Sequence, residues 1–195
     1  MMISVIKPGF LVRNSLGMIL RASSTVTLVR DDKRNIIVDS GIPGERDKIL
    51  KGLSKHGLSQ DDIDIVINTH LHQDHMGNNA LFRKAKFLAH AKEFPPRLKE
   101  VHVIEGDFEL STNIKIIETP CHTYGSISVV VDSPEKSRVY VIAGDALPIK
   151  DNYIKWVPPG INFNPQIALS SMKKIVDIAD VIIPGHDDLF EVESG

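Results

Sequence analysis

Short apolar segments rich in β-branched residues recur along the chain, separated by polar and turn-forming residues. Segments of this length and composition predict β-strands. The expected strands cover residues 3–6, 25–30, 35–39, 63–68, 86–89, 101–104, 114–118, 126–132, 138–142 and 181–183.

Helical periodicity appears between and after these strands. Ile49 and Leu53 share one helix face, and Gly57 provides a stop signal. The expected helices cover 45–56, 78–82 and 165–179, and a further helix begins at Ala91 and ends at Pro95 and Pro96. Strands in runs, with helices between and after them, favour two packed sheets with helices outside, which is a four-layer αββα sandwich.

The composition is that of an ordinary globular protein, and we expect one domain over residues 1–195. The formal net charge of −2 argues against a large phosphate-binding surface. The single cysteine, Cys121, excludes an intrachain disulfide and fits a reducing compartment. Polar residues interrupt every N-terminal apolar stretch, and no apolar run is long enough to span a bilayer. We therefore expect a cytoplasmic protein without a signal peptide or membrane contact.

Three histidines and one aspartate fall within six residues, directly after the strand expected at 63–68. They are His70, His72, Asp74 and His75. Such crowding of imidazoles and carboxylates predicts a bound divalent metal. If the strand continues through His70 and His72, their side chains share one face, because side chains alternate along a strand. Asp74 and His75 then turn away and could serve a second metal.

Three further expected strands run into a potential metal ligand. The strands at 114–118, 138–142 and 181–183 lead to His122, Asp145 and His186. Singly, each residue has an ordinary interpretation, such as a hydrogen-bonded core histidine or an Asx-turn carboxylate. Together with the first cluster they favour strand ends that converge on one metal site.

The motifs His-x-His-x-Asp-His, Thr-Pro-x-His-Thr-x-Gly-Ser, Gly-Asp and Pro-Gly-His occur in this order. This pattern resembles the metallo-β-lactamase superfamily, and the Val-Asp-Ser-Gly of residues 38–41 looks like the family's Val-Asp-Thr-Gly turn. The resemblance covers nearly the whole chain and implies the αββα fold. It implies one metal held by His70, His72 and His122, a second held by Asp74, His75 and His186, and Asp145 bridging both.

The resemblance implies metal-dependent hydrolysis by a hydroxide that bridges two divalent ions, with Asp74 orienting or deprotonating the attacking water. Imidazole and carboxylate donors suit zinc, while iron and manganese stay open. Related di-iron flavoproteins carry Glu where this chain has His72, which disfavours oxygen reduction. Persulfide dioxygenases of the same fold use one iron, so the resemblance leaves the identity and the number of the metal ions open. The histidine ligands should also donate their second ring N–H to outer partners that the sequence does not identify.

The expected substrate is a small molecule with an ester-like bond, and the net positive charge of a loaded site favours an anionic one. A phosphodiesterase or endoribonuclease is the alternative, so RNA stays open as a partner. A mononuclear-iron dioxygenase, or a metal-binding protein without turnover, is a third reading. True β-lactamase activity is disfavoured, because those enzymes lack a bridging ligand at the position of Asp145. A homodimer is also left open.

Substrate contacts are expected on loops around the strand ends. Residues 146–164 form a long, Pro-rich segment that carries Tyr153 and Trp156. A loop of this length predicts a pocket wall or lid, or alternatively a loop held by aromatic packing. Tyr124 is a further candidate at the edge of the site.

Two residues beside the motifs favour structural roles. Cys121 stands where the family usually has Gly, and a free cysteine is often a small buried hydrophobe. His90 lies at a strand end, where we expect it to make a structural hydrogen bond.

Overall fold

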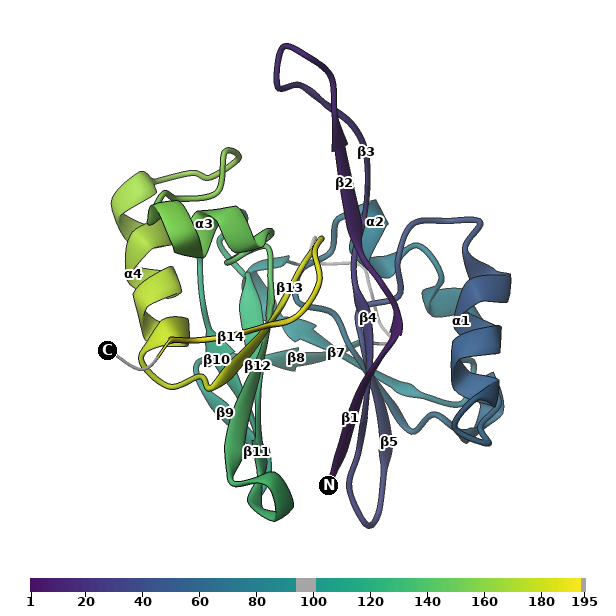
Figure 1. Ribbon diagram of the computed structural model, residues 1–195. Helices are drawn as coiled ribbons and strands as arrows, with labels where there is room; N and C mark the ends of the chain where they lie inside the picture. Colours follow the sequence, from purple (N-terminus) through teal and green to yellow (C-terminus); the bar gives the residue numbers. More distant parts are fainter. Residues whose placement is uncertain (94–100, 194–195) are drawn as a thin grey trace.

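The computed structural model describes residues 1–93 and 101–193, which form two six-stranded β-sheets and a separate hairpin (Figure 1). The first sheet has the order β1-β4-β5-β6-β7-β8. Its strands are β1 (Met2–Lys7), β4 (Val26–Arg30), β5 (Asn35–Val38), β6 (Ile65–Ile67), β7 (Lys86–His90) and β8 (Val101–Ile104). The second sheet has the order β14-β13-β12-β11-β10-β9. Its strands are β9 (Phe108–Ser111), β10 (Ile114–Glu118), β11 (Ile127–Ser133), β12 (Arg138–Gly144), β13 (Val181–Pro184) and β14 (Phe190–Glu191).

The two sheets pack face to face. Because side chains alternate along each strand, each strand sends some side chains into the core between the sheets and the others to the outer face. In β5, Ile36 and Val38 belong to the core between the sheets, whereas Ile37 belongs to the outer core of the first sheet. In β13, Ile183 faces the core between the sheets and Ile182 faces outward. Both faces of each sheet are therefore apolar, and each sheet needs a helical cover.

Helices cover the two outer faces (Figure 1). α1 (Arg46–Ser54) packs Ile49 and Leu53 against the first sheet. α4 (Pro165–Val176) packs Ala168 and Ile175 against the second. This is the predicted αββα sandwich. Among the described residues, no helix is both long and apolar enough to cross a membrane.

Most elements lie close to their predicted bounds, but several short ones were missed. These are the hairpin strands β2 (Phe10–Arg13) and β3 (Ile19–Ser23), the edge strands β9 and β14, and the helices α2 (Gln73–Met76) and α3 (Lys150–Lys155). α3 falls within the segment expected to be a loop. Its Tyr153 packs against the outer core of the second sheet, a contact that helical periodicity does not reveal.

The remaining elements are single 3₁₀ turns: η1 (Gln60–Asp62), η2 (Asn79–Leu81), η3 (Ala91–Glu93) and η4 (Pro134–Lys136). The helix expected at 78–82 is therefore a 3₁₀ turn. The helix expected from Ala91 begins as one too, and Pro95 and Pro96 lie outside the described residues.

Candidate metal centre

The first two histidines of the cluster lie on a loop. β6 ends at Ile67, so the strand does not continue through His70 and His72, and the condition for their side chains to share a strand face is not met. The backbone N–H of Thr69 donates to Asp39 Oδ1 at 2.8 Å, and the Thr69 hydroxyl donates to Asp39 Oδ2 at 2.8 Å. Because a side chain accepts these bonds in place of a strand partner, the ladder stops and the chain turns away from the sheet.

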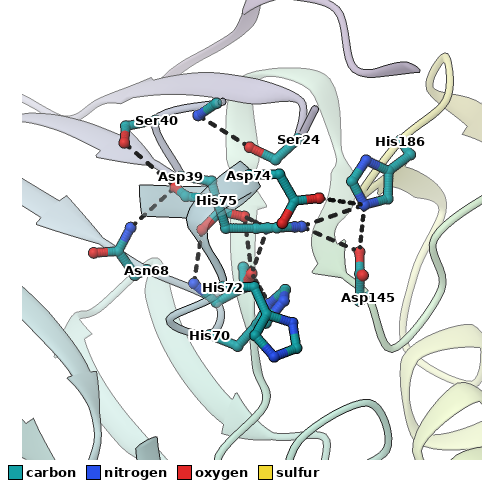
Figure 2. A network of polar contacts seen from close by, with 12 residues as sticks. Ser24, Asp39, Ser40, Asn68, His70, His72, Asp74, His75, Asp145 and His186 are labelled. Carbon is teal, nitrogen blue, oxygen red and sulfur yellow. Dashed lines mark hydrogen bonds and ion pairs between the residues drawn. The ribbon is translucent and has the colours of Figure 1, made fainter. Parts of the chain in front are cut away.

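The other candidate ligands come from a short helix and from the ends of three strands. Asp74 and His75 lie on α2. His122, Asp145 and His186 follow β10, β12 and β13 in the second sheet. Figure 2 shows residues from both halves of the chain pointing toward one another.

The ligand atoms of all seven residues lie close together, and Figure 2 labels all of these residues except His122. Asp145 Oδ1 lies 3.3 Å from His75 Nε2 and 3.1 Å from His186 Nε2. His122 Nε2 lies 3.7 Å from Asp145 Oδ2 and 2.8 Å from His72 Nδ1. The residues form three overlapping groups, each with ligand atoms within 4.8 Å of one another: His70–His72–His122, His70–His75–Asp145 and Asp74–His75–His186. The groups share residues and so form one continuous cluster.

Backbone carbonyls orient two of the imidazoles from the side away from the cluster. His186 Nδ1 lies 3.0 Å from the carbonyl oxygen of Ser23, and His122 Nδ1 lies 2.9 Å from that of Ile161. A carbonyl oxygen only accepts hydrogen bonds, so Nδ1 carries the hydrogen in both rings. The Nε2 lone pair of each ring therefore faces the cluster.

His75 and His70 have side-chain partners on their outer side. His75 Nδ1 donates to Asp39 Oδ2 at 2.8 Å, and His70 Nδ1 lies 3.3 Å from Thr69 Oγ1. Sequence reasoning missed all of these partners. The Val-Asp-Ser-Gly turn is a signal that could have identified Asp39, whereas a backbone carbonyl leaves no trace in the sequence.

Two atoms at the centre of the cluster have no hydrogen-bond donor. His70 Nε2 and Asp145 Oδ1 are buried and lack hydrogen-bond partners. In the neutral rings of His75 and His186 the outer partners leave a lone pair on Nε2, so Asp145 Oδ1 then faces acceptors on both sides. A buried acceptor without a donor costs about 1–3 kcal/mol. A cation between these atoms would satisfy all of them, so the residues fit a metal ion.

The electrostatics of the cluster also suit a cation. Complete burial, reinforced by His75, lowers the pKa of His70 well below its ordinary value, so the ring is neutral and can bind a metal. Burial alone would raise the pKa of Asp145, but His75 and His186 hold it well below its ordinary value. Burial alone would lower the pKa of His75, but Asp39 and Asp145 raise it well above its ordinary value. Asp39 and Asp145 therefore favour a positive charge between them, which a proton on His75 supplies in the metal-free protein and a metal ion would supply in its place.

Steric contacts explain why the Pro-Gly-His motif has glycine at position 185. β12 and β13 pair in parallel, so their ends lie side by side. A Cβ at Gly185 would collide with Asp145 Oδ1. Glycine therefore lets the loop that carries His186 approach the carboxylate at the end of β12.

A cavity of about 540 Å³ opens onto the cluster. The candidate ligands that line it are His72, Asp74, His122, Asp145 and His186. The opposite lining comes from the β2–β3 hairpin, which projects beyond the sheets (Figure 1), and from residues 159–161.

The hairpin register explains which of its side chains reach the cavity. Leu11 pairs with Ala22, and Arg13 pairs with Ile19. Cross-strand partners share a face, and all four of these residues line the cavity. Among the described residues that line the cavity, Arg13 is the only lysine or arginine.

The aromatic candidates for the substrate pocket, Tyr124, Tyr153 and Trp156, do not line this cavity. Tyr153 packs on Phe190 with ring centroids 5.2 Å apart. Tyr124 stacks on Phe163 at 4.3 Å, and Trp156 ends α3 with a half-exposed side chain. Tyr153 also packs on the outer core of the second sheet, which fits the alternative of a segment held by aromatic packing.

Cys121 and His90 make local hydrogen bonds and belong to none of the candidate ligand groups. The buried Cys121 Sγ–H donates to the backbone oxygen of Asp145 at 3.2 Å. His90 Nε2 lies 2.7 Å from Glu118 Oε1. Both contacts agree with the structural roles expected for these residues.

Comparison with known proteins identifies the family. The model of the metallo-beta-lactamase superfamily matches residues 20–93. A relative from Methanocaldococcus jannaschii, named a probable metallo-hydrolase, is 43% identical over 193 residues, covering 96% of this chain and 88% of the relative. The chain belongs to the metallo-β-lactamase superfamily. Another superfamily member, metallo-beta-lactamase domain-containing protein 1 of Xenopus laevis, is 30% identical over 184 residues, covering 90% of this chain and 76% of the relative.

A solved structure of the superfamily agrees with this assignment. An N-acyl homoserine lactone hydrolase, with its product N-hexanoyl-L-homoserine bound at the catalytic metal centre, has a TM-score of 0.72 and 25% identity. The similarity covers 88% of this chain and 84% of that one. The chain is thus a metallo-β-lactamase-superfamily hydrolase with a candidate His/Asp metal site.

Proposed function

We propose that this hydrolase holds two divalent metal ions, with zinc as the native ion, and cleaves an ester-like bond in a small molecule. The observation that carries the proposal is the convergence of seven donor residues whose central atoms lack hydrogen-bond donors. Imidazole and carboxylate donors in such a set suit zinc. One ion would be held by His70, His72 and His122, the other by Asp74, His75 and His186, and Asp145 would lie between them.

The chain's own residues orient the reacting groups and move the proton. When bound, metal ions lower the pKa of a water to about 7 and polarise a carbonyl oxygen. Asp74 lines the cavity, so its carboxylate is accessible from the substrate side. We assign it to accept the proton of the attacking water and to return that proton to the leaving oxygen. Asp74 is the catalytic residue of this proposal.

The cavity favours a substrate with an apolar part and a negative charge. Leu11, Ile19 and Ile161 contribute apolar lining, and Arg13 contributes a cation. A volume of about 540 Å³ is the size of a small-molecule pocket. The product named for the lactone hydrolase, N-hexanoyl-L-homoserine, is also an apolar acyl chain joined to a polar group. We therefore propose an anionic ester or lactone with an apolar acyl group as the substrate class.

The proposal is tested with residues 1–195, which we propose to act as one domain. Elemental analysis of protein purified without added metal should give close to two zinc ions per chain. Zinc-loaded protein should hydrolyse acyl lactones or carboxylate-bearing aryl esters in a panel that also contains thioesters, a phosphodiester and short RNA.

A matched pair of variants sharpens this test. Asp145→Asn should lose metal and turnover together, whereas Asp132→Asn, which alters an exposed carboxylate on β11, should change neither. One iron per chain would overturn the two-metal site. Cleavage of RNA alone would overturn the assignment to an ester-like substrate.

A further inference from the structure

Glu93 connects two loops that carry candidate ligands, although it belongs to none of the ligand groups. It ends the 3₁₀ turn that follows β7. Glu93 Oε2 accepts the backbone N–H of Leu71 at 2.9 Å, and Oε1 accepts the backbone N–H of Gly125 at 3.1 Å. Leu71 separates His70 from His72, so one carboxylate holds the first ligand loop to a second, distant one.

The second loop is the turn that follows His122, and its glycine is explained by Glu93. A Cβ at Gly125 would lie 2.7 Å from Glu93 Cγ and 2.8 Å from Oε1. Gly125 has no positive φ, so the close approach of Glu93, rather than the backbone conformation, requires glycine. The turn is closed by Ser126, whose Oγ accepts the N–H of Thr123 at 3.1 Å.

Glu93 acts at one end of the cluster only. His75 and His186, at one end, are oriented by Asp39 and by the carbonyl oxygen of Ser23. The loops of the His70–His72–His122 group, at the other end, are joined by Glu93. Loss of Glu93 should therefore affect one end of the cluster more than the other.

We propose that Glu93 is a positioning residue that preorganises the His70–His72–His122 group and thereby strengthens the binding of one of the two metal ions. The inference rests on the two-metal site proposed above. A carboxylate has acceptors on both oxygens, so it can serve both backbone N–H groups at once. Glutamine has the same shape, but its NH₂ group would face one of these N–H donors and release one loop.

The test compares Glu93→Gln with Glu109→Gln, which makes the same charge change on the exposed face of β9. Zinc binding to metal-free protein is followed by competition with a chromophoric chelator, which resolves the two binding steps. In Glu93→Gln, one step should weaken by about 10–100-fold while the other stays as in the wild type. The visible spectrum of cobalt-substituted protein should change for the same ion only. Glu109→Gln should bind both ions as the wild type does.

A second variant protects the test against a simple loss of stability. Gly125→Ala should displace Glu93 and weaken the same step, and its effect should shrink in a Glu93→Ala background. Thermal unfolding of the metal-free proteins measures any general destabilisation separately. If Glu93→Gln binds both zinc ions with wild-type affinity, or if both zinc-binding steps weaken equally, this inference is overturned while the proposed function stands. A wild-type protein that binds fewer than two zinc ions would overturn the proposed function, and this inference with it.

Discussion

His75 Nδ1 donates a hydrogen bond to Asp39 Oδ2 at 2.8 Å, and both side chains are buried. Asp39 directly follows β5, and its carboxylate also accepts the backbone N–H of Thr69 at 2.8 Å. One carboxylate thus orients a candidate ligand ring and fixes the start of the loop that carries two more ligands. Such an outer carboxylate sets the tautomer of a histidine ligand and raises its basicity.

Asp39→Asn should therefore weaken zinc binding by about 10–100-fold, because an amide orients the His75 ring without the negative charge. Zinc content after dialysis against graded chelator concentrations measures the loss. Asp132→Asn is the matched control on an exposed strand position. Equal zinc retention in Asp39→Asn and the wild type would contradict this role of Asp39.

A buried ion pair that contains none of the candidate ligands predicts acid sensitivity. Lys7 Nζ lies 2.8 Å from Glu45 Oε2, and both side chains are largely buried. Burial alone would raise the pKa of Glu45, but hydrogen bonds from Lys7, Ser23 and Lys48 lower it from 4.5 to about 2. Because the folded-state pKa lies below the unfolded one, this stabilisation is complete above pH 4.5 and is lost as the pH falls toward 2.

Glu45→Gln should lower the free energy of unfolding at neutral pH by about 3 kcal/mol, because the Lys7 ammonium loses its charged partner. The difference from the wild type should shrink as the pH falls below 4.5. Urea unfolding of chelator-treated protein at several pH values measures it without a contribution from metal release. A difference that stays constant down to low pH would show that ionised Glu45 is not its source.

The hairpin register predicts different effects for two arginines. Arg13 pairs with Ile19 and lines the cavity, whereas Arg21 pairs with Val12 and lies 5.6 Å from the Phe10 ring centroid. If Arg13 contacts the anionic group of the substrate, Arg13→Gln should raise KM for a carboxylate-bearing ester about tenfold, the value of one charge-assisted hydrogen bond. kcat should change little, and KM for a neutral ester of equal size should not change.

Steady-state kinetics on the two esters measures this effect, with Arg21→Gln as the control from the same hairpin. An equal rise in KM for both esters would mean that Arg13 shapes the hairpin and does not recognise charge.

The only thiol should be unreactive in the folded protein. Burial, as the largest cause, raises the pKa of Cys121 to about 12, so the nucleophilic thiolate is scarce at pH 8. Mass spectrometry after treatment with iodoacetamide should find Cys121 unlabelled in native protein and fully labelled in urea. Rapid labelling of native protein would contradict this burial.

Local patterns in the sequence predicted the αββα layers and the seven clustered residues. Alternation such as Ile36-Ile37-Val38 reports which residues face each core, because strand geometry repeats every two residues. The ligand candidates could be found because their residue types and spacing are unusual. Local patterns do not reveal where β6 stops. The strand does not continue through His70, because the side chain of Asp39, thirty residues earlier, ends the ladder at Thr69.

The sequence by itself determined most strands of the two sheets and which side chains could bind a metal, since both depend on residue type and near neighbours. Only the tertiary structure decided how the candidate ligands are oriented. Asp39, Glu93 and the carbonyl oxygens of Ser23 and Ile161 act through contacts between distant segments, and a backbone oxygen has no residue-type signature. Tertiary packing also decided that the β2–β3 hairpin and residues 159–161 line the cavity, whereas the side chains of Tyr153 and Trp156 do not.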